Sequence, residues 1–212
     1  MLYFFAYVCY NLIGDNMLTM KDVIQDGHPT LRKRANEVEW PLSEENLNKL
    51  RSMMEYIENS QDQEMAEEYD LRPGVGLAAP QINQSLKMFC MKTLDEDFES
   101  LHQYAVVNPK IISFSEAKTY LPGGEGCLSV DEDTTGIVLR SKKIRVKAYF
   151  VDLKTGEGQY KQIKLSGYPG IVFQHEYDHL LGTLFIDKIE ESIPNVKPIE
   201  FKLPETEEEE NL

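Results

Sequence analysis

The stretch Gln174-His175-Glu176-Tyr177-Asp178-His179 decides both the centre of the fold and the chemistry of this sequence. It contains the pattern H-E-x-x-H. Residues four apart lie on the same face of an α-helix, so His175 and His179 can bind one metal ion together. Glu176 points to an adjacent part of the helix surface, where it can take a proton from a water molecule beside that metal. The pattern therefore predicts a metal-binding helix that also carries a general base.

The residues around this stretch are typical of a buried helix. Pro169 lies where a first helical turn tolerates a missing N–H group, and Gly182 follows as a stop signal. Apolar residues surround the polar cluster: Ile171, Val172, Phe173, Leu180 and Leu181. Buried polar groups need partners, so the alternative to a metal site is a helix with two hydrogen-bonded core histidines.

The composition is typical of a soluble globular chain. Its 212 residues suit one domain with a full core, or one domain with tails. Three cysteines, Cys9, Cys90 and Cys127, are too few and too scattered for a disulfide scaffold, so we expect a reducing, cytoplasmic location. The net charge of −14 argues against direct nucleic-acid binding, because contact with phosphates needs clustered Lys and Arg.

Both ends of the chain differ from its centre. Leu2 to Ile13 is almost wholly apolar, but it is shorter than the about 20 residues of a membrane-spanning helix and lacks the basic start of a signal peptide. We expect Met17 to be the natural start and residues 1–16 to be a non-native, upstream extension, with a membrane or partner anchor as the alternative. Residues 17–190 form one predicted domain, and residues 191–212 form an acidic tail that we expect to be flexible.

The centre of the chain predicts an N-terminal helix followed by short strands. Ser43 is a good N-cap, and apolar residues follow it at helical spacing: Leu47, Leu50, Met54 and Ile57. Residues 59–70 continue this helix or form a second short one. Strands are predicted at residues 87–91, 104–107, 111–114, 118–121, 144–151 and 160–165. Asn108-Pro109 is expected to end the second of them, and residues 185–189 predict one more extended segment.

Two glycine-rich stretches interrupt this pattern. Gly74-Val75-Gly76-Leu77-Ala78-Ala79-Pro80-Gln81 is a tight loop that lets another backbone approach closely, although a structural turn explains it equally. Gly123-Gly124-Glu125-Gly126-Cys127-Leu128-Ser129 places a cysteine in open backbone rather than in a core strand. Cys90 lies inside an apolar run, and we expect it to be an inert core residue.

The metal site needs a third ligand, because catalytic zinc-type sites usually have three protein ligands and one open position. The zinc-protease extension H-E-x-x-H-x-x-G-x-x-H is followed as far as Gly182, but Phe185 replaces its last histidine. The other candidates lie in strand-like or turn-like contexts: Glu190, Glu191, His28 and His102. Cys127 is therefore the best third ligand, since a thiolate binds strongly and the metal keeps it deprotonated.

Three motifs together resemble the signature of the peptide deformylase family. They are Gly74-Val75-Gly76-Leu77-Ala78-Ala79-Pro80-Gln81, Glu125-Gly126-Cys127-Leu128-Ser129 and Gln174-His175-Glu176-Tyr177-Asp178-His179. The resemblance covers about Met17 to Ile189 and is strongest to the type found in low-GC Gram-positive bacteria. It implies that residues 17–190 are the catalytic domain. The expected fold class is α+β, with mixed or antiparallel β-sheets wrapped around the central H-E-x-x-H helix and with an N-terminal helix.

The resemblance also implies a reaction, the hydrolysis of the N-formyl group from formyl-methionine at the start of new proteins, which releases formate. Cys127, His175 and His179 would then hold one divalent metal, and Glu176 would move the water proton to the leaving amine. Gln81, through its side-chain N–H, and Leu128, through its backbone N–H, would stabilise the oxyanion. Iron(II) is the metal expected from the family, and zinc, nickel and cobalt also suit this ligand set.

The expected partners are N-formyl-methionyl peptides or nascent chains, bound by a monomer without contact to membranes. An extended substrate would lie between the two glycine-rich stretches, against Val75, Gly76, Gly126, Tyr168, Ile171 and Val172. Many family members carry an arginine seven residues after the metal cysteine, where this chain has Thr134. The alternatives are a different H-E-x-x-H metallopeptidase and a non-catalytic metal-binding homologue.

Overall fold

The computed structural model describes residues 17–131, 134–190, 192 and 195–202. The predicted extension at residues 1–16 and most of the predicted acidic tail lie outside these residues. None of the described helices combines the length and the hydrophobicity that crossing a membrane requires.

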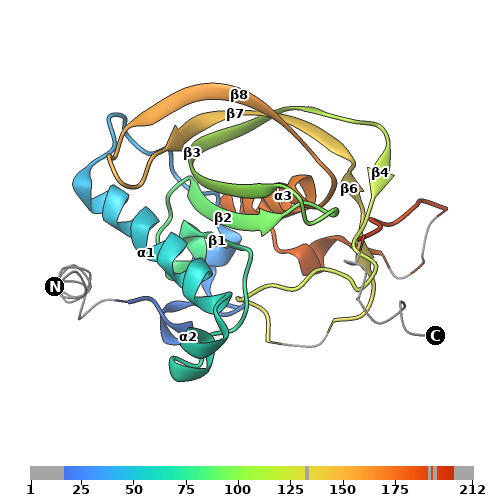
Figure 1. Ribbon diagram of the computed structural model, residues 1–212, viewed down its shortest axis with the longest axis horizontal. Helices are drawn as coiled ribbons and strands as arrows, with labels where there is room; N and C mark the ends of the chain where they lie inside the picture. The colour runs from blue at the N-terminus through green and yellow to red at the C-terminus, as the bar shows by residue number, and fades with distance from the viewer. Residues whose placement is uncertain (1–16, 132–133, 191, 193–194, 203–212) are drawn as a thin grey trace, which may run out of the picture.

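A long central helix and a curved five-stranded sheet organise the fold. Helix α3 (Gly167–Leu181) carries the H-E-x-x-H motif, and the strands arch over it (Figure 1). The sheet order is β1-β2-β3-β7-β8, and every neighbouring pair is antiparallel. The strands are β1 (Gly76–Ala78), β2 (Met88–Leu94), β3 (Leu101–Phe114), β7 (Lys143–Val151) and β8 (Gly158–Ser166). The expected α+β fold with antiparallel sheets around the motif helix is confirmed.

Shorter elements complete the domain. Helix α1 (Glu44–Ser60) starts at the N-cap Ser43, whose hydroxyl accepts the Asn46 N–H at 3.2 Å, as the sequence predicted. The second short helix is α2 (Gln63–Glu68). Two small antiparallel sheets pair β4 (Lys118–Thr119) with β6 (Arg140–Ser141), and β5 (Ile137–Val138) with β9 (Ile189–Glu190). The described residues also form the 3-10 helices η2 (Met20–Asp22), η3 (Pro29–Arg32), η4 (Ala79–Ile82) and η5 (Phe185–Lys188).

Strand β2 separates two hydrophobic cores. Alternate side chains of a strand point to opposite faces of its sheet. Met88 and Cys90 accordingly pack into the core that α1 covers, and Phe89 and Met91 pack into the core around α3. Phe89 meets Phe173 of α3 edge to face, with ring centroids 4.9 Å apart. The apolar run that the sequence shows here is thus a strand buried on both faces.

Two predicted boundaries were wrong. Asn108-Pro109 does not end a strand but lies at an irregularity within β3, where the pairing with β7 shifts register between Val107 and Lys110. The bulge tolerates a proline without an N–H, and the Asn108 side chain bonds both the N–H and the carbonyl of Val38, at 2.8 and 2.7 Å. The segment at residues 185–189 is mainly the 3-10 helix η5, and only its end joins a strand.

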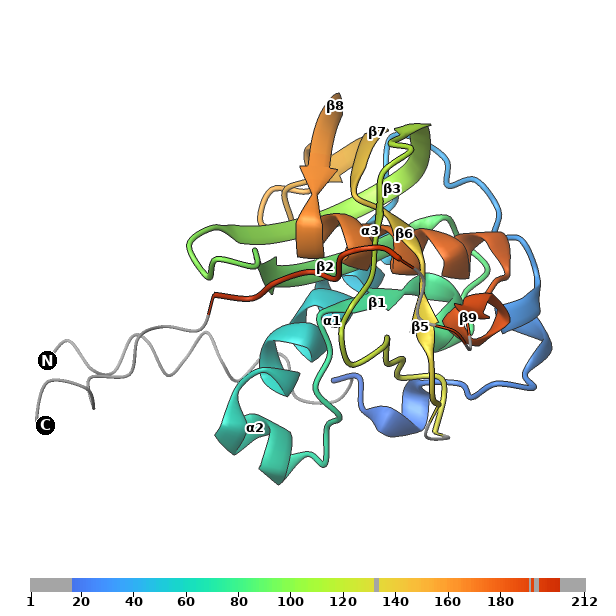
Figure 2. The same ribbon diagram turned by 90° about the vertical axis from the view of Figure 1, so that its right-hand side faces the viewer.

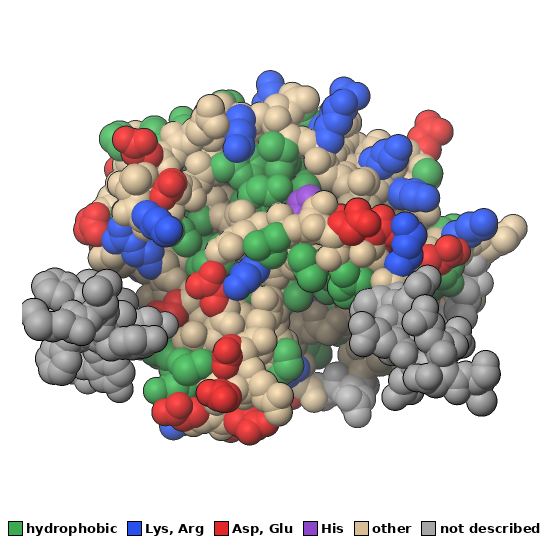
Figure 3. Space-filling model, viewed as in Figure 1, with side chains coloured by type: hydrophobic (Ala, Val, Ile, Leu, Met, Phe, Trp, Pro, Cys, Tyr) green, Lys and Arg blue, Asp and Glu red, His purple; other side chains and the backbone are tan. Residues whose placement is uncertain are grey.

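The surface charge is unevenly distributed. Acidic side chains gather over α2, and basic side chains lie over β7 and β8 on the face shown in Figure 3. The basic residues of these two strands are Lys143, Arg145, Lys147, Lys161 and Lys164. The net charge of −14 is a sum over both regions, so the absence of direct nucleic-acid binding stays a prediction.

Candidate active site

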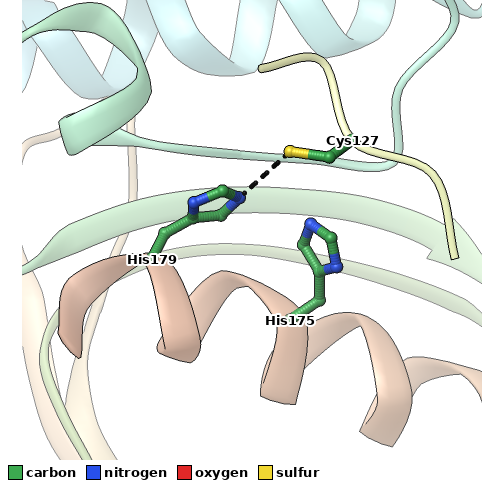
Figure 4. Close-up of side chains that lie close together, drawn as sticks. All are labelled: Cys127, His175 and His179. Atoms are coloured by element: carbon green, nitrogen blue, oxygen red, sulfur yellow. Dashed lines mark hydrogen bonds between the residues drawn. The ribbon is translucent and has the colours of Figure 1, made fainter. Parts of the chain in front are cut away.

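Cys127, His175 and His179 meet at one point. One ligand atom from each of the three lies within 4.8 Å of the others. The Cys127 Sγ atom is 3.4 Å from Nε2 of His179, and both histidines project from α3 toward the cysteine (Figure 4). The helix places them one turn apart, and Cys127 comes from the loop that faces the helix. A sulfur and two imidazole nitrogens form a donor set that suits zinc or iron(II), with room for a fourth ligand.

Glu176 lies beside this point with an unused oxygen. The residue is 3% exposed, and its Oε2 atom has no hydrogen-bond partner among the described residues. A buried, unpartnered carboxylate oxygen is costly unless a ligand or a water uses it. This orphaned atom therefore supports a site in which Glu176 contacts a group held by the three metal-suited side chains.

Gly76 of β1 makes room for Glu176. A Cβ atom at residue 76 would lie 2.2 Å from Oε1, 2.6 Å from Cδ and 2.8 Å from Cγ of Glu176. Distances under 3.0 Å are essentially never seen for real Cβ atoms, so a larger residue would displace the carboxylate. The sequence suggested that a glycine here lets a second backbone approach closely. The structure adds a second reason, since only a glycine leaves space for the Glu176 side chain.

A buried network of charges holds His175. Its Nδ1 atom lies 2.8 Å from Oε2 of Glu125, so the other ring nitrogen is left to face Cys127. Arg140 binds both carboxylate oxygens of Glu125, at 2.7 and 2.8 Å, and also bonds Asp178 of α3. Lys188 donates to Asp178 at 2.6 Å. Glu125 and Asp178 lie within the sequence motifs, but no role was predicted for them, and Arg140 was not predicted as a site residue.

The environment shifts the acid–base properties of these groups. Burial disfavours the charge of Glu125, but hydrogen bonds from Arg140 and His175 outweigh burial and hold its pKa at about 2. Burial also disfavours the charge of His175, whereas its hydrogen-bonded neighbours raise its pKa well above the usual range. Burial raises the pKa of Glu176 to about 7. Burial and nearby positive charge lower the pKa of His179 well below its usual value.

The side chain of Gln81 is held with its amide nitrogen toward the cysteine. Its Oε1 atom accepts the Ala78 N–H at 2.8 Å, which fixes the orientation of the amide. The Nε2 atom lies 3.5 Å from Cys127 Sγ and 3.3 Å from Ser129 Oγ. Gln81 is 1% exposed, so these donors are shielded from bulk water.

A cavity of about 520 Å³ opens onto this centre. The predicted site residues that line it are Val75, Gly76, Gln81, Gly126, Cys127, Leu128, Tyr168, Ile171, Val172, His175 and Glu176. His179, the remaining residue of the ligand cluster, does not line the cavity. Thr134 does not line the cavity, but Arg72 does, and its guanidinium donates to the carbonyls of Cys127 and Val130, both at 3.2 Å. An arginine from another element thus supports the cysteine loop.

The alternative ligands lie away from the cluster. The Nδ1 atom of His28 accepts the Thr30 N–H at 3.2 Å and caps η3, as its turn context predicted. His102 is on β3, and Glu190 is in β9. Glu191 lies outside the described residues.

The chain is similar to known proteins. The family model described as polypeptide deformylase matches residues 20–194, which is most of the chain. The chain belongs to the polypeptide deformylase family. It is 50% identical to the peptide deformylase of Staphylococcus epidermidis over 184 residues, covering 87% of this chain and 97% of that relative. It is 51% identical to peptide deformylase 2 of Bacillus cereus over 186 residues, covering 88% and 98%.

Solved deformylase structures share the fold. The crystal structure of the Thermotoga maritima peptide deformylase has a TM-score of 0.58 and 37% identity, covering 79% of this chain and 96% of that one. An actinonin-bound deformylase of Acinetobacter baumannii has a TM-score of 0.59 and 29% identity, covering 82% and 100%. The resemblance to the deformylases of low-GC Gram-positive bacteria is confirmed. This deformylase is a metal-dependent hydrolase that removes the N-formyl group from the start of new proteins.

Proposed function

We propose that Cys127, His175 and His179 hold one divalent cation and that Glu176 is the general base of the deformylation. The observation that carries this proposal is the convergence of three ligand atoms within 4.8 Å beside a buried, unpartnered carboxylate oxygen. A bound cation supplies electrophilic assistance to the formyl oxygen and activates water. The remaining chemistry belongs to the side chains of the chain itself.

Glu176 moves one proton in two directions. It accepts the proton of the water that attacks the formyl carbon and then delivers it to the nitrogen of the leaving amine. The C–N bond of the formamide breaks, and the products are formate and a peptide with a free amino terminus. A buried carboxylate with a raised pKa suits this role, because it must both accept and release a proton near neutral pH.

Gln81 and Leu128 stabilise the oxyanion in this proposal. The Gln81 amide nitrogen points toward Cys127 because its oxygen is occupied by the Ala78 N–H. Leu128 follows the cysteine directly and lines the same cavity, so its backbone N–H is the second donor. Preorganised donors of this kind are each worth about 10²–10³ in rate.

The substrate binds as an added strand at β1. This strand has only β2 as a sheet neighbour among the described elements, so its other edge can pair with a peptide, except at the Ala78 N–H, which donates to Gln81. The peptide would run between Val75-Gly76 and Gly126. The formyl-methionine side chain would enter the apolar part of the cavity formed by Tyr168, Ile171 and Val172, which suits an unbranched thioether.

Iron(II) is the proposed native metal, in a monomer that works in the cytoplasm without direct nucleic-acid binding. The ligand set accepts zinc, nickel or cobalt as well, so the metal must be measured. Protein purified without oxygen should contain iron and should lose activity in air. Full activity of an air-stable zinc form would contradict iron as the native metal.

A formate-release assay with metal analysis on the same sample tests the proposal. Formyl-Met-Ala-Ser should release formate, whereas acetyl-Met-Ala-Ser and internal peptide bonds should stay intact. Glu176→Ala should keep the metal and lose turnover. Cleavage of internal bonds would favour a metallopeptidase, and turnover by Glu176→Ala would contradict the assigned base.

A further inference from the structure

The segment at residues 197–202, here called the C-terminal strap, is fixed at both ends. At its start, the Lys197 carbonyl accepts the Thr119 hydroxyl at 3.1 Å, and the Ile199 N–H donates to the Tyr120 carbonyl at 2.9 Å. At its end, the Lys202 N–H donates to the Glu96 carbonyl at 3.0 Å. Figure 2 shows the strap (red) running from beside β6 toward the turn between β2 and β3.

The strap places an aromatic ring in the wall of the substrate cavity. Phe201 lines the cavity, and its ring lies edge to face on Tyr168, with centroids 5.2 Å apart. Phe98, from the turn between β2 and β3, also lies near this ring, with centroids 6.1 Å apart. Phe201 is still 36% exposed, so it has a free surface that a ligand can cover.

Glu96 locks this ring to the helix that carries the proposed base. Its carboxylate accepts the Tyr168 N–H at the start of α3 at 3.1 Å, while its carbonyl accepts the Lys202 N–H. Lys202 also pairs with Asp97 at 2.9 Å. Hydrogen bonds therefore link the strap, the turn after β2 and the first turn of α3, and they set the position of Phe201 relative to the cavity.

The strap follows the residues that the family model matches. The family model ends at residue 194, before the strap begins. Phe201 is also the only aromatic residue after Phe185 in the sequence. Its ring contacts Tyr168, one of the residues proposed to receive the methionine side chain.

We infer that Phe201 is a specificity-determining residue, which forms the outer wall of the pocket for the first side chain of the substrate. This inference rests on the proposed function. An aromatic wall makes favourable contacts with a long, flexible, apolar side chain, whereas a methyl group is too short to contact it. Phe201 therefore adds to the preference for formyl-methionine over formyl-alanine without touching the reacting atoms.

A comparison of two proteins, each assayed with two substrates, tests this inference as in a double-mutant cycle. Metal-loaded wild type and Phe201→Ala are assayed with formyl-Met-Ala-Ser and formyl-Ala-Ala-Ser. We expect kcat/KM of the variant to fall about tenfold with the methionine peptide, mainly through KM, and less than twofold with the alanine peptide. Phe114→Ala is the matched control, because Phe114 is an exposed aromatic that does not line the cavity.

An equal change for both peptides, or no change for either, would overturn the assignment. If Phe201→Ala does not fold, Phe201→Leu carries the test, with an expected loss of about threefold that is again limited to the methionine peptide. The same cycle can be read from calorimetric binding of Met-Ala-Ser and Ala-Ala-Ser, which needs no turnover. Absent formate release by wild type would count against the proposed function, whereas absent coupling in binding would count against Phe201 alone.

Discussion

The close approach of Gly76 to Glu176 gives the sharpest prediction. In Gly76→Ala, the new Cβ would lie 2.2 Å from Oε1 of Glu176, whereas ordinary contacts begin at 3.4 Å. The carboxylate must therefore move by about 1 Å. The three nearest atoms all belong to the Glu176 side chain and not to the backbone, so we expect β1 to keep its pairing with β2 and the fold to survive. A displacement of about 1 Å in a catalytic group can cost about 100-fold in rate.

The assay measures kcat for formyl-Met-Ala-Ser together with metal content and melting temperature. We expect kcat of Gly76→Ala to fall about 100-fold while metal content stays near one per chain, because the three ligands are untouched. Gly123→Ala is the matched control, since a Cβ at residue 123 would meet no atom within 4 Å. A kcat within about threefold of wild type in Gly76→Ala would refute the argument that the glycine fixes the position of Glu176.

Three further predictions address the metal, the fold and a buried thiol. Glu125→Gln should weaken metal binding about 10–100-fold in a chelator competition, because His175 loses the carboxylate that orients its ring; unchanged affinity would contradict this. Gly158→Ala should lower the melting temperature, with a cost of about 1–3 kcal/mol, because its Cβ would lie 2.0 Å from the Trp40 ring; an unchanged melting curve would contradict the clash. Cys90 should resist alkylation in native protein and react only after unfolding, as peptide mapping can show, because burial raises the pKa of its thiol; labelling in the native state would oppose this.

The main elements and the candidate site were predictable because their signals are local. The two histidines and the glutamate share one helix, and the spacing of that helix sets their geometry before any tertiary contact forms. Cys127 was reached by eliminating other ligands, and the structure brings it within 3.4 Å of His179. The roles assigned to these residues remain proposals.

The missed features depend on contacts between distant parts of the chain. No local sequence signal distinguishes Arg140 from other polar residues. Its contacts with Glu125 and Asp178 form only in the folded chain. The strand break expected at Asn108-Pro109 does not occur. The Asn108 side chain replaces the lost strand pairing by hydrogen bonds to the backbone of Val38, 70 residues earlier in the chain. Phe201 stands in a polar stretch that gives no periodic signal.

The position of β2 between two cores determines which substitutions the chain can accept together. Met88 and Cys90 point only toward α1, and Phe89 and Met91 point only toward α3. A substitution in α1 can therefore be compensated by changes at Met88 and Cys90, whose side chains do not pack into the core around α3. Helix α1 and these two side chains can therefore change in sequence together while the β2 side chains that pack around α3 stay the same.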